Sequence, residues 1–302
     1  MADVPTAAGA EEFLTLRREQ EVAHMRHSAG RDPMDSLLCV ELNPTELCNR
    51  KCPFCPRVNP AIYPNRNLQM TVEVAGKVAH DLAEIGSKCR ISVTGFGEPL
   101  LNPRITELIA AVRKHLPENA IEINTNGDRL TVKRIQELFR SGISEIYVNC
   151  YDGPEQETVF RKRFAAAGVD DSCFKIRKHW PEVGPDFGLE LNNRSGTIVD
   201  SDLGLKPPTD PLQRHCFYPF FKMFVDWNGD FVFCANDWGR EITIGNVLET
   251  HLRDLWLSEQ MRKIRSRLAH KDRSVAPCST CTVKGDLYGG MSFKILQEHY
   301  GW

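Results

Sequence analysis

Between residues 38 and 179, short apolar runs alternate with longer segments whose apolar positions recur every three or four residues. The short runs predict strands at 38–42, 90–94, 120–124, 145–150 and 174–179. The longer segments predict helices at 71–85, 103–116, 131–140 and 154–167. Because strands and helices alternate, we expect a parallel sheet with right-handed crossovers, and hence an α/β fold. In such sheets the chemistry gathers at the carboxyl ends of the strands.

The pattern changes on either side of this region. Residues 11–27 are charged with scattered apolar positions and predict a helix that lies against the next domain. Residues 186–215 are rich in Pro, Gly, Asp and Asn and predict a connector. Residues 223–227 and 230–233 then predict a hairpin across an Asn-Gly turn. The expected division is an N-terminal extension (1–37), an α/β domain with its connector (38–215) and a small α+β domain (216–302).

The composition is that of an ordinary globular protein. The 302 residues are 41% hydrophobic and 26% charged, and no run of 18 apolar residues predicts a membrane span. A net charge of −2 gives no reason to expect binding to nucleic acid or to an acidic membrane. The N-terminus lacks the layout of a secretory signal, so we expect a cytoplasmic protein. In that reducing compartment its 11 cysteines would be metal ligands and free thiols rather than disulfides.

Three of these cysteines, Cys48, Cys52 and Cys55, follow the first expected strand at C-x₃-C-x₂-C spacing. Three thiolates in one short loop can hold a four-iron cluster and leave one iron open for a substrate or cofactor. The alternatives are three free thiols or a zinc site with its fourth ligand elsewhere. The spacing fits neither common zinc pattern.

This loop, with Phe54 directly before the third cysteine, resembles the signature of the radical S-adenosylmethionine (SAM) enzymes. The resemblance implies a partial (β/α)₆ barrel, whose sixth strand we expect within residues 188–191. It also implies that SAM binds the open iron of a [4Fe-4S] cluster. One electron then cleaves SAM to a 5′-deoxyadenosyl radical, which abstracts hydrogen from the substrate.

Two further motifs resemble SAM-binding motifs of this family. Gly95, Gly97 and Glu98 follow the second expected strand, where the family holds the SAM amino group, although Phe96 stands where the family often has glycine. A plain turn would explain the glycines but not the carboxylate. Asn124 and Asn126 belong to a Thr-Asn-Gly turn at the end of the third strand, and an ordinary Asn-Gly turn is the alternative.

The fourth expected strand ends at Cys150, where relatives have a serine near SAM. Strand alternation places Ile146, Val148 and Cys150 on one face. Cys150 is either a catalytic thiol at the mouth of the barrel, able to donate hydrogen in an epimerisation, or a small buried apolar residue. In the connector, Arg194 is a candidate to bind a polar substrate or to lie in a solvated loop.

A second cysteine set consists of Cys216, Cys234, Cys278 and Cys281. Structural zinc is one interpretation of four cysteines. The C-x₁₂-G-x₄-C spacing with a later C-x₂-C instead resembles the SPASM/Twitch extension of radical SAM enzymes. That resemblance implies one auxiliary [4Fe-4S] cluster, fully ligated by these four residues, because the seven cysteines of the full pattern are not present.

The resemblance also frames the reaction and the partners. Peptide-modifying relatives often carry an N-terminal recognition domain, for which 37 residues are too few. We therefore expect a small sugar or aminocyclitol substrate that is dehydrogenated or epimerised, with an external one-electron reductant of the flavodoxin or ferredoxin class. A peptide- or protein-modifying enzyme is the second hypothesis. An iron–sulfur electron-transfer protein is the third, and the Glu98 motif argues against it because an electron carrier needs no SAM site.

Overall fold

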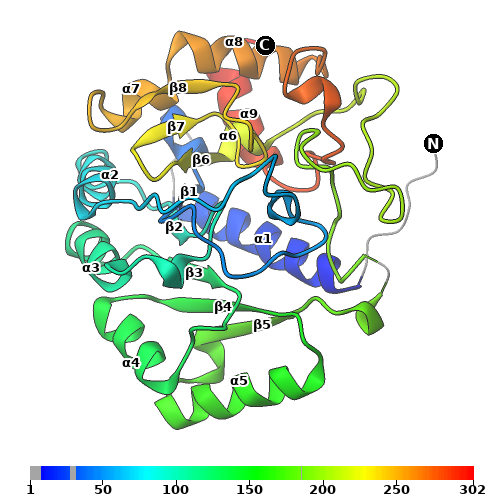
Figure 1. The fold of residues 1–302 in the computed structure, drawn as a ribbon. Helices are drawn as coiled ribbons and strands as arrows, with labels where there is room; N and C mark the ends of the chain where they lie inside the picture. The colour runs from blue at the N-terminus through cyan, green and yellow to red at the C-terminus, as the bar shows by residue number, and fades with distance from the viewer. Residues whose placement is uncertain (1–7, 28–31, 185) are drawn as a thin grey trace.

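One curved sheet of eight strands organises the molecule, in a computed structural model that describes residues 8–27, 32–184 and 186–302 (Figure 1). The strand order is β5-β4-β3-β2-β1-β6-β7-β8. The strands are β1 (Cys39–Leu42), β2 (Arg90–Val93), β3 (Ile121–Thr125), β4 (Glu145–Cys150), β5 (Phe174–Lys178), β6 (Lys222–Val225), β7 (Asp230–Val232) and β8 (Thr243–Asn246). The five strands expected between residues 38 and 179 are all present, which confirms the α/β fold class.

The sixth strand of the parallel part is β6, which pairs with β1 from Cys39–Lys222 to Leu42–Val225. The expectation of this strand within residues 188–191 is wrong, since that segment forms no strand. Residues 222–225 supply an apolar run with three buried side chains that fits beside β1. β7 pairs antiparallel with β6, as the Asn228-Gly229 hairpin predicts, and β8, which the sequence did not predict, pairs antiparallel with β7. One sheet thus crosses the expected domain boundary after residue 215, and the division into domains stays a prediction.

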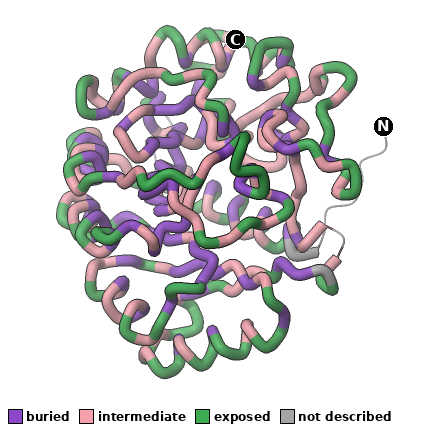
Figure 2. Tube along the Cα trace, in the orientation of Figure 1, coloured by how far each residue is buried: buried purple, intermediate pink, exposed green. Residues whose placement is uncertain are grey.

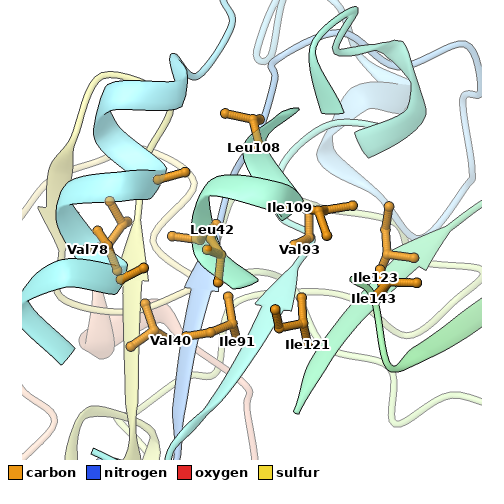
Figure 3. Close-up of a cluster of buried hydrophobic side chains, with 14 of the residues drawn as sticks. Val40, Leu42, Val78, Ile91, Val93, Leu108, Ile109, Ile121, Ile123 and Ile143 are labelled. Atoms are coloured by element: carbon orange, nitrogen blue, oxygen red, sulfur yellow. The ribbon is translucent and has the colours of Figure 1, made fainter. Parts of the chain in front are cut away.

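Four crossover helices cover one face of the sheet: α2 (Val72–Glu84), α3 (Ile105–His115), α4 (Val132–Ser141) and α5 (Pro154–Ala167). Figure 3 shows the contact, in which Val40, Leu42, Ile91 and Val93 meet Val78 and helix α3. Thr71 and Thr131 cap α2 and α4 by accepting hydrogen bonds from Val74 N and Arg134 N. The purple interior of Figure 2 follows this buried layer.

Four further helices lie around β6 to β8 at the other end of the sheet. They are α6 (Tyr218–Phe221), α7 (Leu252–Trp256), α8 (Glu259–Ala269) and α9 (Gly290–Tyr300). Among the described residues, no helix combines the length and the apolar character needed to cross a bilayer.

Helix α1 (Ala8–His27), which the charged N-terminal pattern predicts, contacts both the sheet and the C-terminal helix α9. Its Arg17 forms a buried ion pair with Glu122 of β3. Its Glu21 accepts hydrogen bonds from Gly289 N at 2.9 Å and Met291 N at 2.8 Å, where α9 begins. The carboxylate therefore caps α9 and complements its N-terminal partial charge. Residues 1–7 and 28–31 of the expected N-terminal extension lie outside the described residues.

Candidate active site and two cysteine sites

A cavity of about 370 Å³ lies inside the curved sheet, between the carboxyl ends of the strands and α1. Its lining includes the residues that the sequence marks for the SAM site. These are Cys48, Cys52, Phe54, Cys55, Gly95, Gly97, Glu98, Asn124 and Asn126. The structure thus brings together residues from the loops after β1, β2 and β3.

The cysteine loop is tied to the strands beside it by Arg50. Its guanidinium donates to both oxygens of Asp128, after β3, and to both oxygens of Asp152, after β4, at 2.6 to 2.8 Å. Asn49 adds a hydrogen bond to Asp128 at 2.5 Å and accepts one from Asn126 at 2.9 Å. Bidentate arginine–carboxylate pairs fix geometry as well as charge. The loop is therefore held over the mouth of the cavity at two points.

Gly95 and Gly97 let the loop after β2 approach the loop after β1. A Cβ at Gly97 would meet the Thr45 carbonyl oxygen at 2.1 Å, and one at Gly95 would meet Asn43 Oδ1 at 2.4 Å. The Glu98 amide donates to the Leu47 carbonyl at 2.7 Å, one residue before the first cysteine. The two glycines are thus required for the close contact between these loops, whether or not their backbone also binds a ligand.

Phe96, which departs from the family pattern, packs in an aromatic cluster with Tyr63, Phe224 and Trp238. Its ring centroid lies 4.4 Å from that of Trp238 and 4.6 Å from that of Phe224. The side chain therefore joins the loop after β2 to the C-terminal part of the sheet.

Glu98 is buried at the wall of the cavity, with 3% of its surface exposed. Its carboxylate accepts hydrogen bonds from Thr125 Oγ1 at 2.6 Å, Asn126 N at 2.7 Å and Leu100 N at 3.0 Å. Burial raises its pKa to about 7 despite these donors. Two carboxylate oxygens can accept about four hydrogen bonds, so one more donor can be accommodated.

Asn124 and Phe54 also present themselves to the cavity. Asn124 Oδ1 is buried and has no hydrogen-bond partner among the described residues, so it can accept a bond from a ligand. Phe54 packs against Tyr151 and Phe187, with ring centroids 6.2 and 5.2 Å away. These rings form an aromatic wall beside the cysteine loop.

Cys150 does not line the cavity, which corrects the expectation that it faces the mouth of the barrel. Ile146, Val148 and Cys150 do share one face, but that face packs into the apolar core beneath the helices. The Cys150 thiol lies 3.5 Å from the Gly153 carbonyl. The physical reason is polarity: the opposite face of β4 carries Asn149, and Tyr151 follows it, and these polar side chains line the cavity. The grouping of residues by strand alternation was correct, but the face that carries Cys150 packs against the helices and the opposite face lines the cavity.

The second cysteine set lines its own small cavity. Cys216, Cys234, Cys278 and Cys281 all face it, together with apolar side chains such as Phe233 and Leu268. A hydrogen bond from Asn236 N reaches Cys234 Sγ at 3.4 Å. The structure therefore brings together all four cysteines that the sequence groups.

One wall is shared between the two cavities. Tyr218 lines both, Arg194 lines the first and Ser195 lines the second. Arg194 donates to Asn236 Oδ1 at 3.2 Å, and Asn236 lines the second cavity. A substrate in the first cavity would thus be separated from the second cysteine set by a few side chains.

The sulfur spacing tests which inorganic group fits these sites. Four sulfurs around one zinc ion, each at 2.3 Å, would lie about 3.8 Å from one another. Within the described parts of the chain, the only group with three ligand atoms within 4.8 Å of one another is His80, Asp81 and Glu84. No three sulfurs of either set lie that close together in this structure, and this wider spacing fits an iron–sulfur cluster. In the His80 group, Lys77 Nζ already lies 2.7 Å from both Asp81 oxygens.

The thiols also need a cation to become thiolates. Burial, helped by the neighbouring thiols, raises the pKa of Cys52 to about 12, and burial raises the pKa of Cys216 to about 11. A bound metal reverses this preference because its charge stabilises the deprotonated sulfur. The donor sets fit one cluster with three protein ligands and a second with four.

Sequence reasoning missed part of the cavity, namely Arg17, Arg177, His179 and Lys222. Lys175 and Arg177 alternate along β5 and His179 directly follows it, so a polar face was readable there. Burial, with the Arg177 charge beside it, lowers the pKa of His179 to about 4, so its imidazole is neutral at pH 7. Arg17 carries no local signal, since its role depends on how α1 packs.

Comparison with family models agrees with this arrangement. The model of the radical SAM superfamily matches residues 42–177, and the model of SPASM, an iron–sulfur cluster-binding domain, matches residues 216–282. The two matches contain the first and the second cysteine set, respectively.

Characterised proteins are similar over most of the chain. The S-adenosyl-L-methionine-dependent 2-deoxy-scyllo-inosamine dehydrogenase of Niallia circulans is 28% identical, over 83% of this chain and 94% of that protein. A tungsten-containing aldehyde ferredoxin oxidoreductase cofactor-modifying protein of Pyrococcus furiosus is 22% identical, over 80% of this chain and 86% of that protein.

Two solved structures share the fold. A crystal structure of BtrN in complex with AdoMet and 2-DOIA has a TM-score of 0.67 at 22% identity, covering 84% of this chain and 97% of that one. Native anSMEcpe with bound AdoMet has a TM-score of 0.53 at 14% identity, covering 87% of this chain and 97% of that one.

Proposed function

Because the chain belongs to the radical SAM superfamily and carries a SPASM iron–sulfur domain, we propose that it dehydrogenates a small polyhydroxylated substrate of the sugar or cyclitol type. The radical SAM and SPASM domains bind a [4Fe-4S] cluster with SAM and an auxiliary iron–sulfur cluster. The 28% identical dehydrogenase, similar over 94% of its own length, supports the reaction and substrate class.

The roles of the residues follow from their places in the cavity. When bound, the first cluster and SAM supply a 5′-deoxyadenosyl radical, which takes a hydrogen atom from a substrate carbon. Cys48, Cys52 and Cys55 hold that cluster, and Glu98 accepts the SAM amino group at its remaining lone pair. Asn124 Oδ1 accepts a hydrogen bond from the ligand, and Phe54 provides an apolar wall. Cys216, Cys234, Cys278 and Cys281 hold the auxiliary cluster.

The observation that carries the proposal is the wall between the two cavities. Loss of hydrogen leaves a substrate radical, which becomes a ketone only if it gives up a further electron and a proton. Arg194 lines the substrate side of this wall, Tyr218 lines both cavities, and Asn236 and Cys234 lie behind them. The second cysteine set is thus held where a one-electron acceptor is needed. An external carrier of the flavodoxin or ferredoxin class would supply the electron for SAM cleavage.

The size of the cavity favours a small substrate over a peptide. Ala10, Phe13, Leu14 and Arg17 of α1 line the inner end, and about 370 Å³ is within the range of small-molecule sites. A peptide or protein substrate is the second enzyme hypothesis. Glu98, a buried carboxylate in the wall of the cavity, argues against a protein that only carries electrons.

Epimerisation is the second candidate reaction. It needs a thiol that returns hydrogen from the face opposite the radical. Cys150 is not available for this because its thiol lies in the core. Cys39 lines the inner end of the cavity, opposite the cysteine loop, and is the thiol that an epimerase would use.

The test is anaerobic turnover of the reduced holoenzyme with SAM and a panel of deuterated sugars, cyclitols and peptides. We expect deuterium in 5′-deoxyadenosine with one hydroxylated ring compound and a ketone as product. An inverted product carrying one solvent deuterium in D₂O, lost in Cys39→Ala, would establish epimerisation instead. Deuterium transfer from peptides alone would reject the small-substrate proposal.

A further inference from the structure

Two consecutive residues of the connector are held in a backbone conformation that side chains disfavour. Arg194 has a φ of 46° and Ser195 has a φ of 55°. Residues other than glycine are uncommon in this left-handed region, because Cβ comes too close to the following carbonyl oxygen. Such residues persist where the surrounding structure fixes them, and they cluster beside functional sites. The contacts of this pair show what the conformation achieves.

The connector is fixed to the turn that carries two cysteines of the second set, residues 278–281. Asn193 is fully buried, its Nδ2 donates to the Thr280 carbonyl at 2.7 Å, and its Oδ1 accepts from Thr282 N at 3.0 Å. Thr280 Oγ1 donates to the Ser195 carbonyl at 3.2 Å. These bonds hold the strained pair against the cysteine turn.

The side chain of Arg194 lies between the two cavities. It lines the active-site cavity, and its Nη1 donates to Asn236 Oδ1 at 3.2 Å. Asn236 lines the second cavity, with only 5% of its surface exposed. Its main-chain N–H donates to Cys234 Sγ at 3.4 Å, and its side-chain Nδ2 lies 4.0 Å from the same sulfur. One carboxamide therefore accepts a bond from the arginine at one end and faces a cysteine sulfur with the other.

This arrangement bears on the electron affinity of a cluster that Cys234 holds. Hydrogen bonds to the sulfurs help to set the reduction potential of an iron–sulfur cluster. Reduction adds negative charge, so an N–H group that faces the sulfur stabilises the reduced form and raises the potential. The bond from Arg194 to Oδ1 fixes which end of the Asn236 carboxamide faces the sulfur.

We infer that Arg194 is a positioning residue that orients Asn236 on Cys234 and thereby raises the reduction potential of the auxiliary cluster. This rests on the proposed function, which assigns the four C-terminal cysteines to that cluster. The substrate radical becomes a ketone by losing a proton to water and one electron, which the oxidised cluster takes up. A higher potential of the cluster favours this transfer.

The test is a redox titration of the anaerobic holoenzyme, in which electron paramagnetic resonance follows each reduced cluster. The signal that changes on addition of SAM belongs to the first cluster, and the other signal belongs to the auxiliary cluster. The variants are Arg194→Gln, Arg194→Lys, Asn236→Ala and a double variant that combines Arg194→Gln with Asn236→Ala. Arg262→Gln is the matched control, because Arg262 is 43% exposed on α8 and pairs with Glu259.

We expect Arg194→Gln to lower the midpoint potential of the auxiliary cluster, with at least a threefold loss in the equilibrium constant for its reduction. At about 59 mV per tenfold for one electron, a threefold loss is about 28 mV. Arg194→Lys should recover part of it, because lysine keeps the charge and a donor for Oδ1. The double variant should have the same potential as Asn236→Ala alone, since Arg194 acts through Asn236. Arg262→Gln should change nothing, and every variant should keep its iron.

Three results would overturn the inference. The first is an unchanged or higher potential in Arg194→Gln. The second is a double variant in which the two losses add, because the charge of Arg194 would then act on the cluster directly. The third is a loss of iron from the second cysteine set in Arg194→Gln, which would make the residue a structural one. Failure of the proposed function has a different appearance: no ring compound would transfer deuterium, while the shift in potential persisted in the Arg194 variants.

Discussion

Arg17 of α1 and Glu122 of β3 form a bidentate ion pair, with the Nη1–Oε2 and Nη2–Oε1 distances both 2.9 Å and only 4% of each side chain exposed. Ser92 Oγ donates to the same carboxylate at 2.8 Å. Burial alone would raise the pKa of Glu122, but Arg17 and Arg90 hold it at about 2. The N-terminal helix is thus fastened to the inside of the sheet by a charge that stays ionised throughout the neutral range.

Removing one partner of this pair should be costly. Arg17→Ala leaves a buried carboxylate without its main cation, so we expect a loss of about 3 to 5 kcal/mol in the free energy of unfolding. Arg18→Ala is the control, because Arg18 is 45% exposed and pairs with exposed Glu11, and it should cost less than about 1 kcal/mol. Denaturant titration of both holoproteins measures the difference. Equal stability of the two variants would show that α1 is not fastened by this pair.

Iron content should report the two cysteine sites separately. Anaerobically reconstituted protein should hold about eight irons. Changing Cys48, Cys52 and Cys55 together to Ala should remove about half of the iron and abolish SAM cleavage, while changing the four C-terminal cysteines should remove the other half. Stoichiometric zinc in the second set, resistant to iron reconstitution, would contradict the auxiliary cluster.

SAM affinity should depend on pH through Glu98. Burial raises its pKa to about 7, so the carboxylate that pairs with the SAM ammonium is lost as pH falls through 7. We expect the dissociation constant of SAM to rise between pH 8 and pH 6. Glu98→Gln should bind SAM at least about tenfold more weakly at pH 8, since a charged hydrogen bond contributes about 1.5 to 3 kcal/mol. Iron content should not change, and a variant with wild-type affinity would remove Glu98 from the site.

Alanine substitutions at two glycines should have opposite effects, because one glycine is in close contact with another loop and the other lies on an uncrowded helix. Gly97→Ala should lose the first cluster, because its Cβ would strike the Thr45 and Leu47 carbonyl oxygens. Gly76→Ala on α2 meets nothing nearer than Ala111 at 4.0 Å and should stabilise the protein by about 1 kcal/mol. Iron analysis and thermal unfolding compare the two. Retention of the full iron content by Gly97→Ala would show that the two loops can separate without harm.

Cys150→Ala should leave the product unchanged, whatever the reaction is. The thiol lies in the core, so we expect a stability loss of about 1 kcal/mol and unaltered turnover per bound cluster. A changed product in this variant would show that Cys150 takes part in the reaction.

The parts of the site that lie close together in sequence could be predicted, and the parts assembled by tertiary packing could not. The cysteine loop and Glu98 lie directly after strands, so spacing and strand order were enough to bring them together. Arg17 meets the cavity only because α1 packs inside the curved sheet, and nothing in the local pattern of residues 11–27 shows this.

The errors have physical causes of the same kind. Residues 222–225 were expected only as a hairpin strand of a separate domain, since a pairing with β1 joins residues more than 180 positions apart. Cys150 was placed on the wrong side of β4 because period-two alternation shows which residues share a face, but not which face lines the cavity and which packs against the helices. The polarity of Asn149 and Tyr151 decides that question.

The place of β6 beside β1 bears on how the protein is made. A ribosome releases β1 and the cysteine loop early, but β6 emerges only after about three quarters of the 302 residues have been synthesised. Until then one edge of β1 has no partner, and Trp238 and Arg240, which pack against Phe96 and Glu46 behind the loop, do not yet exist. The surroundings of the first iron site are therefore complete only in the finished chain. Iron and sulfur delivered to the nascent chain would find the three cysteines without the C-terminal residues that support their loop.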